Sequence, residues 1–174
     1  EYYCRAYAQQ YMLPYTIVRP FNLYGPGEAS GREPGDSHVI PDLTARALMR
    51  QTPLEIYGGG QQTRSFTHVK DVARGIALAM ESSTAENEDF NLGCPSEITI
   101  LELAKLLWEL CDVGQPFAYC TLQAFPNDIQ RRAVDITKAK TLLGWEPQIN
   151  LRRGLREFVE WMRAQSVARH ALRT

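Results

Sequence analysis

Asn22 is the first residue of this chain whose sequence context could serve binding chemistry. It lies two residues after Pro20, whose ring fixes φ and which lacks an amide hydrogen, so the turn is stiff. The carboxamide of Asn22 offers hydrogen-bond donors and an acceptor from this turn, which could hold a ligand oxygen. The alternative is an Asx turn in which Asn22 only caps backbone amides. The residues alone leave both interpretations open.

Arg64 stands shortly after a glycine triplet at residues 58–60. Glycines let a backbone approach a ligand closely, and the guanidinium could then meet a phosphate in fork geometry. The alternative is a plain hairpin turn with a solvated arginine. The triplet differs from the dinucleotide fingerprint G-x-G-x-x-G, which occurs nowhere in the chain. Arg64 is therefore a candidate for binding an anion, and the triplet does not predict a dinucleotide site.

Composition narrows the class of protein. Of the 174 residues, 44% are apolar and 22% are charged, which is typical of a globular domain, and no apolar stretch approaches membrane-spanning length. A net charge of −1 disfavours nucleic acid or an anionic membrane as partner. Cys4, Cys94, Cys111 and Cys120 lie far apart without a C-x-x-C pair, so we expect reduced thiols and no metal site. The first residues are acidic and aromatic and do not resemble a signal peptide, so we expect a cytoplasmic setting.

Hydrophobic periodicity predicts helices along much of the chain. Tyr3, Tyr7 and Tyr11 recur every four residues and place an aromatic stripe on a helix that ends near residue 12. Thr99 and Glu102 have the spacing of a capping box, which predicts that a helix begins after Thr99 and covers residues 100–111. The other expected helices cover residues 40–47, 69–80, 137–143 and the stretch after residue 150. The helix at 69–80 has the clearest apolar stripe, formed by Val69, Val72, Ala73, Ile76, Ala77 and Met80.

Short apolar runs predict strands between these helices, at residues 15–19, 53–58, 90–93 and 117–122. The first run is apolar on both faces, which suits a buried parallel strand. Residues 20–37 are expected to form a loop whose length is uncommon unless the loop is functional. Helices alternating with strands indicate an α/β domain over residues 1–165, followed by a loose tail at 166–174.

Three motifs carry a family resemblance. They are RPFNLYGPG at residues 19–27, GGGQQTRSFTHVKDVARG at 58–75 and NDIQRRAVDITKAKTLLGWEP at 127–147. Together they resemble the substrate-binding half of the NAD-dependent sugar-nucleotide epimerases and dehydratases, the extended short-chain dehydrogenase/reductase family. The resemblance implies the carboxy-terminal part of a Rossmann-type fold, with a small mixed α/β substrate domain. Because this family's catalytic Tyr-x-x-x-Lys precedes a segment like the first residues here, the sequence is expected to be a fragment.

The resemblance assigns roles to several residues. Pro20 and Asn22 would lie beside the nicotinamide, with Asn22 also contacting the sugar nucleotide near its diphosphate. Arg64 would reach that pyrophosphate. Tyr57 matches a position that can stack on the nucleotide base, although it could equally be a half-buried strand aromatic. His38 would either line the nucleotide pocket or face solvent.

The last motif implies further contacts. Asp128 belongs to the family's substrate site, and many relatives carry an arginine three residues before it, where this chain has Phe125. That departure puts one phosphate contact in doubt. Arg131 and Arg132 would point to opposite faces of a strand, so only one of them can readily reach the diphosphate with Arg64, and we prefer Arg131.

Catalysis in the family depends on a tyrosine, a lysine and an amino-terminal NAD domain, and none of them can be mapped onto this chain. We therefore expect no catalytic residue, no activity of the chain alone and NAD only in the parent enzyme. His68 precedes an expected helix, with Asp71 three residues on, and a structural role is favoured over that of a general base.

The expected function is that of the substrate-binding half of a nucleotide-sugar epimerase or dehydratase. It would bind a nucleoside diphosphate sugar for oxidation and reduction by the missing NAD domain. The alternative is a non-catalytic binding or helper module that pairs with a separate chain, and a structural protein without a ligand is a third possibility. In the family the tyrosine-striped helix belongs to the dimer interface, which implies a homodimer or pairing with the missing half.

Overall fold

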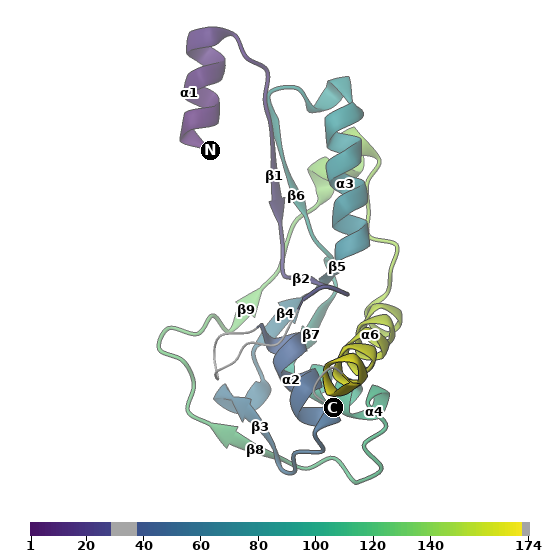
Figure 1. Ribbon diagram of the computed structural model, residues 1–174. Helices are drawn as coiled ribbons and strands as arrows, with labels where there is room; N and C mark the ends of the chain where they lie inside the picture. The colour runs from purple at the N-terminus through teal and green to yellow at the C-terminus, as the bar shows by residue number, and fades with distance from the viewer. Residues whose placement is uncertain (29–37, 172–174) are drawn as a thin grey trace. The chain divides into compact units, whose positions relative to one another are not determined.

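The computed structural model of the chain describes residues 1–28 and 38–171, which group into two compact units (Figure 1). Unit 1 comprises residues 1–23, 65–96 and 133–149, and unit 2 comprises residues 24–64, 97–132 and 150–174. The chain thus enters each unit more than once, and a two-residue strand, β2 (Leu23–Tyr24), lies where it first passes from one to the other. We describe the units separately.

Unit 1 is built on a pair of parallel strands, β1 (Thr16–Pro20) and β6 (Glu88–Leu92), in which Val18 is the partner of Phe90. Its helices are α1 (Tyr2–Tyr11), α3 (Val69–Glu81) and α5 (Thr137–Leu143). The short strand β5 (Thr67–His68) precedes α3, and the 3₁₀ turn η2 (Ser83–Ala85) follows it. Phe90 and Trp145 are almost completely buried at the centre of the core. Strand β6 begins at Glu88, two residues before the strand predicted at 90–93.

Helix α3 forms where the periodicity predicted it, and Val72 of the expected apolar stripe is buried, but other residues of that stripe are not. Ile76 is 39% exposed and Met80 is 81% exposed, whereas Gly75 and Ala79 are buried. A Cβ added at Gly75 would lie 2.6 Å from Leu92 Cδ1, so the helix approaches β6 too closely for a larger side chain. The face that packs on the core therefore combines the apolar Val72 with small residues that allow close approach.

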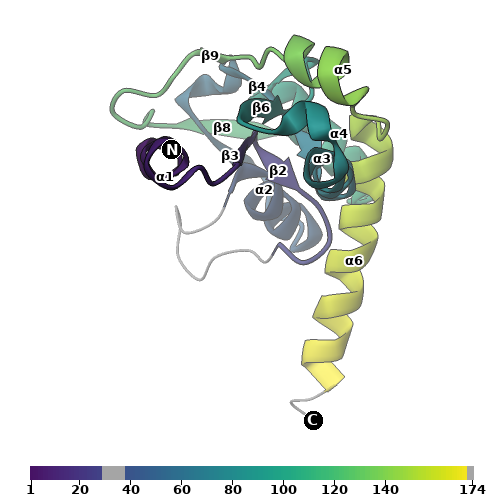
Figure 2. The same ribbon diagram turned by 90° about the horizontal axis from the view of Figure 1, so that it is seen from above.

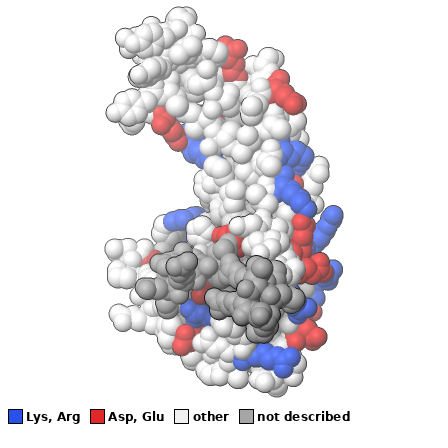
Figure 3. Space-filling view, in the orientation of Figure 1, with Lys and Arg blue, Asp and Glu red and all other residues white. Residues whose placement is uncertain are grey.

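Helix α1 confirms the predicted tyrosine stripe, and none of its residues is buried. Tyr7 and Tyr11 pack against each other with ring centroids 5.3 Å apart, while Tyr2 remains 92% exposed. The helix ends at Met12, whose φ of 53° is left-handed. Figure 3 shows mainly uncharged atoms over this helix.

Unit 2 combines helices with two small sheets (Figure 2). Its helices α2 (Val39–Leu48), α4 (Ile100–Leu110) and α6 (Leu151–Ala171) pack against one another. Strand β3 (Leu54–Tyr57) pairs in parallel with β8 (Tyr119–Leu122), and β4 (Thr63–Ser65) lies between β7 (Glu97–Thr99) and β9 (Arg131–Arg132). The core contains these buried side chains: Leu43, Ile56, Leu103, Leu107, Leu155 and Phe158.

Local signals in unit 2 follow the sequence closely. The capping box is present, since Thr99 Oγ1 accepts from Glu102 N and Glu102 Oε2 accepts from Thr99 N.

Helix α6 continues to Ala171, so residues 166–171 are helical where we expected a tail to begin. Of the loop predicted at 20–37, residues 29–37 lie outside the described residues, and the described part contains the short strand β2. Among the described helices, none is long and apolar enough to cross a membrane.

The glycine triplet turns the chain from β3 toward β4. Gly58, Gly59 and Gly60 form a short 3₁₀ turn, η1, with φ values of 67°, 77° and 78°. Three successive left-handed residues are accessible to glycine and costly for other side chains. The triplet thus allows the reversal that brings Tyr57 and Arg64 to one region of unit 2.

Candidate functional site

Unit 2 contains a pocket of about 190 Å³. It lies among α2, β3, β4, the start of α4 and the loop that joins β8 to β9. Three residues singled out from the sequence line it, namely Tyr57, Arg64 and Asp128. The remaining lining residues are Val39, Asp42, Leu43, Glu55, Gln62, Ile100 and Phe125.

Two aromatic rings form one wall of the pocket. Tyr57 ends β3, and Phe125 lies on the β8–β9 loop, with ring centroids 4.6 Å apart and planes inclined by 28°. This is an offset stack within the range that aromatic pairs prefer. Phe125 is nevertheless 54% exposed. The wall therefore presents an open aromatic surface at the pocket.

Arg64 holds the β8–β9 loop in place. Its Nη2 donates to Asp128 Oδ1 across 2.7 Å, and its Nη1 donates to the backbone oxygens of Thr63 and Ile129 at 2.8 and 2.6 Å. The side chains of Arg64 and Asp128 are 16% and 17% exposed. Partial burial strengthens such a charge-assisted pair relative to one in water. Arg64 is thus placed at the pocket, with its guanidinium engaged by the chain itself.

The other carboxylates of the pocket are also paired. Arg46, which is 8% exposed, lies 3.1 Å from Asp42 and 3.2 Å from Glu55. Asp128 is paired with Arg64 in the same way, so each of the three carboxylates that line the pocket lies beside a guanidinium. The pocket therefore offers little excess positive charge to an anion.

Gln62 was missed by the sequence reasoning. It is only 6% exposed, and its Nε2 donates to the backbone oxygen of Tyr57 across 3.0 Å. That oxygen can only accept, so the bond fixes which end of the amide is the carbonyl. Its Oε1 has no hydrogen-bond partner within residues 1–28 and 38–171. Nothing in the local sequence distinguishes this buried glutamine from its exposed neighbour Gln61.

Arg131 and His38 do not line the pocket. The Arg131 side chain is 76% exposed and pairs with Glu97, with Nη2 2.8 Å from Oε1. Hydrogen bonds from Arg131 and then Thr63 lower the pKa of the Glu97 carboxyl. His38 precedes α2 with its side chain 86% exposed, and its Nδ1 lies 2.5 Å from Glu28 Oε1.

Asn22 and Pro20 belong to unit 1. Asn22 has a left-handed φ of 40°, and its Nδ2 donates to the backbone oxygen of Ser65 across 2.8 Å. Its own backbone oxygen accepts from Thr67 N at 3.1 Å. The side chain of Asn22 thus donates to a distant backbone carbonyl, and the described bonds include no Asx turn in which it caps a backbone amide. Pro20, the last residue of β1, is exposed.

His68 is a helix cap and is almost completely buried. Its exposed fraction is 1%, and its Nδ1 accepts from Lys70 N at the start of α3. Buried beside the first turn of a helix, it serves the structural role that the sequence favoured. Asp71 is also structural, because its Oδ2 accepts from Ile149 N at 2.9 Å.

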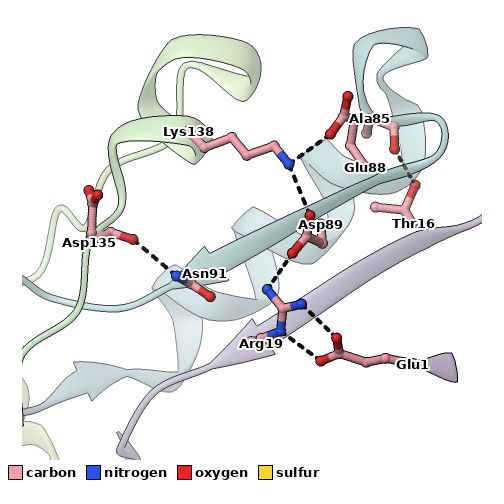
Figure 4. Close-up of polar contacts among 9 residues, drawn as sticks. All are labelled: Glu1, Thr16, Arg19, Ala85, Glu88, Asp89, Asn91, Asp135 and Lys138. Atoms are coloured by element: carbon pink, nitrogen blue, oxygen red, sulfur yellow. Dashed lines mark hydrogen bonds and ion pairs between the residues drawn. The ribbon is translucent and has the colours of Figure 1, made fainter.

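A second charged cluster lies on the β1–β6 pair of unit 1 (Figure 4). Arg19 bridges Glu1 and Asp89, at 2.6 and 2.5 Å, and Lys138 bridges Asp89 and Glu88, at 3.0 and 2.7 Å. Hydrogen bonds from Lys138 and then Arg19 lower the pKa of Asp89. The cluster joins β1, β6 and α5, and each of its charges is partnered within unit 1.

Comparison with known proteins identifies the class. A family model described as "NAD dependent epimerase/dehydratase family" matches residues 1–93, more than half of the chain. The chain belongs to this family. Its motifs and fold are those of the extended short-chain dehydrogenases/reductases that act on sugar nucleotides.

Particular relatives sharpen the comparison. UDP-glucuronic acid decarboxylase 2 of Arabidopsis thaliana is 44% identical over 142 residues, which cover 80% of this chain and 29% of the relative. The structure of UDP-glucose 4-epimerase from Thermotoga maritima with UDP-glucose has a TM-score of 0.84 and 34% identity, covering 95% of this chain and 51% of that chain. UDP-glucuronic acid 4-epimerase from Bacillus cereus, in complex with UDP-glucuronic acid and NAD, has a TM-score of 0.81 and 28% identity, covering 94% and 50%.

These similarities confirm the predicted α/β fold class and the family resemblance. The chain spans about half of the two enzymes of known structure and less than a third of the Arabidopsis relative. The enzymes to which it is similar use sugar nucleotides, as their names state.

Proposed function

We propose that this chain is the substrate-binding portion of a nucleotide-sugar epimerase, dehydratase or decarboxylase. The observation that carries the proposal is the unit 2 pocket, in which Tyr57, Arg64 and Asp128 lie together within a chain of this family. An aromatic wall beside a guanidinium suits a nucleotide, because a base can stack on a ring while a phosphate meets the fork of an arginine.

The ligand proposed is a uridine diphosphate sugar, since the names of the relatives specify UDP-sugars. Tyr57 would form part of the aromatic wall at which the base binds, and Arg64 would contact the diphosphate. Asn22 and Arg131 would add diphosphate contacts only after giving up the bonds they make to Ser65 and Glu97. His38 would approach the ligand from the start of α2, and Asp128 would position Arg64.

NAD is proposed for the parent enzyme, where it would accept and return a hydride at the sugar. The residues of this chain do not fit a dinucleotide site, because G-x-G-x-x-G is absent from the sequence and the Asn22 amide is bound to Ser65. Of the predicted cofactor contacts, only Pro20 and Asn22 belong to this chain. We therefore propose that the chain alone neither binds NAD nor catalyses the reaction.

A helper module that pairs with another chain is the second candidate. The exposed tyrosines of α1 favour it, as does the β1–β6 pair, because two parallel strands rarely form a stable sheet alone. Self-association through α1 would give the homodimer expected from the family. A cytoplasmic setting remains part of this proposal.

Titration calorimetry of this chain with UDP-glucose, UDP-glucuronic acid and NAD tests the proposal. We expect a UDP-sugar to bind and NAD not to bind. The double variant Arg64→Ala, Arg131→Ala should lose UDP-sugar binding, whereas Arg132→Ala, which changes the exposed neighbour of Arg131, should retain it. Circular dichroism and a thermal melt would verify that each variant folds.

Two results would overturn these assignments. Unchanged binding by the double variant would show that the pocket is wrongly assigned. Absence of any UDP-sugar binding by the folded wild-type chain would reject a free-standing binding function and favour the helper module. Sedimentation of the chain alone, compared with Tyr7→Lys, would then measure association through α1.

A further inference from the structure

The charge balance of the unit 2 pocket indicates which part of a nucleotide it suits. Asp42 and Glu55 are paired with Arg46, and Asp128 is paired with Arg64. A diphosphate bound deep in this pocket would lie near three carboxylates and would need a guanidinium that is already engaged. An uncharged group is not repelled by the carboxylates and does not need the engaged guanidinium. The pocket therefore favours the base over the phosphates.

The aromatic wall adds a surface for such a group. Phe125 stacks on Tyr57 with a centroid separation of 4.6 Å, which leaves no room for a third ring between them. Phe125 is 54% exposed, so its face away from Tyr57 remains available. Arg64 anchors the loop that carries this ring by bonding Asp128 and the backbone of Ile129. The ring is therefore held in position before any ligand arrives.

Gln62 supplies a polar feature independent of the rings. Its carbonyl oxygen is buried and without a hydrogen-bond partner in the described parts of the chain, although the residue lines the pocket. A buried acceptor left unpaired costs free energy, which a ligand N–H can recover. Planar heterocycles such as nucleobases carry an N–H beside their stacking face.

We propose that the unit 2 pocket reads the base of the nucleotide through Phe125 and Gln62. The outer face of Phe125 stacks on the heterocycle, and Gln62 Oε1 accepts a hydrogen bond from its N–H. This inference rests on the proposed nucleotide-sugar function and names the specificity-determining residues of that site. It gives Phe125 a role in base recognition at the position where many relatives carry an arginine.

Uridine, which has no phosphate, is the probe that isolates this contact. In titrations followed by saturation-transfer NMR, we expect Phe125→Ala to weaken uridine binding about tenfold, and to weaken UDP-glucose binding by the same factor. Phe125→Trp should retain the affinity for both. Tyr119→Ala is the matched control, because Tyr119 is also an exposed ring in a stacked pair of unit 2 but does not line the pocket.

Two further readouts separate base recognition from a structural role of Phe125. Uridine affinity should be unchanged between low and high salt, because no charged contact is involved. The ligand 3-methyluridine, which lacks the N3–H donor, should bind about tenfold more weakly than uridine to the unaltered protein, because it leaves Gln62 unpaired.

Each outcome decides between the inference and the function. If the wild-type chain binds UDP-glucose while Phe125→Ala keeps full affinity for uridine, the inference fails and the proposed function stands. Tighter uridine binding by Phe125→Ala would also overturn it, by showing that Phe125 blocks Tyr57. Equal binding of 3-methyluridine and uridine would overturn the role of Gln62. If neither UDP-glucose nor uridine binds the folded wild-type chain, the proposed function fails together with the inference.

Discussion

Gly75 of helix α3 lies directly against the buried indole of Trp145. A Cβ added at position 75 would stand 2.8 Å from Trp145 Nε1, which itself donates to the backbone oxygen of Asp71 across 2.9 Å. The indole thus occupies the space that any larger residue at position 75 would need. This contact joins two motifs of the family signature within unit 1.

Gly75→Ala is therefore expected to destabilise the fold, although alanine is the better helix former. The gain in helix propensity is about 1 kcal/mol, whereas overpacking against Trp145 and Leu92 costs about 1–3 kcal/mol. Urea unfolding of the variant beside wild type measures the difference. Met80→Ala, which alters an exposed residue of the same helix, should change stability by less than about 0.5 kcal/mol. A more stable Gly75→Ala protein would contradict the close packing.

Glu97 should contribute to stability at neutral pH and lose that contribution in acid. Hydrogen bonds from Arg131 and Thr63 hold its pKa below the ordinary 4.5. A carboxyl with a lowered folded-state pKa stabilises the fold above its unfolded pKa, and the effect disappears as pH falls through the folded pKa. Glu97→Gln should thus lower the thermal midpoint at pH 7 and converge with wild type in strong acid.

Thermal melts of Glu97→Gln and wild type from pH 7 down to strong acid measure the difference between their midpoints. Glu86→Gln, at an exposed residue of the η2 turn, is the matched control and should follow wild type throughout. A midpoint difference for Glu97→Gln that stays constant down to the lowest pH would show that the carboxylate charge is not the stabilising group.

Cys111 is expected to resist alkylation in the folded chain. It is 5% exposed, and burial raises the pKa of its thiol from 9.0 to about 11, so little thiolate forms at mild pH. Cys4, on the exposed helix α1, should react with iodoacetamide first. Peptide mapping after native and urea-denatured labelling distinguishes the two sites. Equal labelling of both cysteines in the native protein would contradict the burial of Cys111.

Elements that rest on short-range signals could be predicted from the sequence. The Thr99–Glu102 box marks the start of α4, and the helix Thr137–Leu143 ends at Gly144, whose φ is 61°, as predicted. In both cases the deciding bonds join residues a few positions apart, so local chemistry determines the boundary.

Features that depend on distant segments could not be predicted in this way. The face of α3 follows from the approach of Leu92 and Trp145 to Gly75, and hydrophobicity alone favoured Ile76 and Met80. In the pocket, Tyr57 and Arg64 were identified from motifs. The stacking of Phe125 on Tyr57 instead requires a loop 68 residues further along the chain, and the burial of Gln62 requires the surrounding unit.

Because Arg64 is paired with Asp128, the same guanidinium that could bind an anion also holds the β8–β9 loop in place. An anion that recruits the guanidinium must first take it from the carboxylate, and the loop that carries Phe125 then loses an anchor. The free energy needed to release the guanidinium reduces the binding free energy. The same holds for any protein whose binding-competent state is a minor population. An anion that binds through Arg64 would therefore bind more weakly than it would to a free guanidinium, because breaking the Arg64–Asp128 pair costs part of the binding free energy.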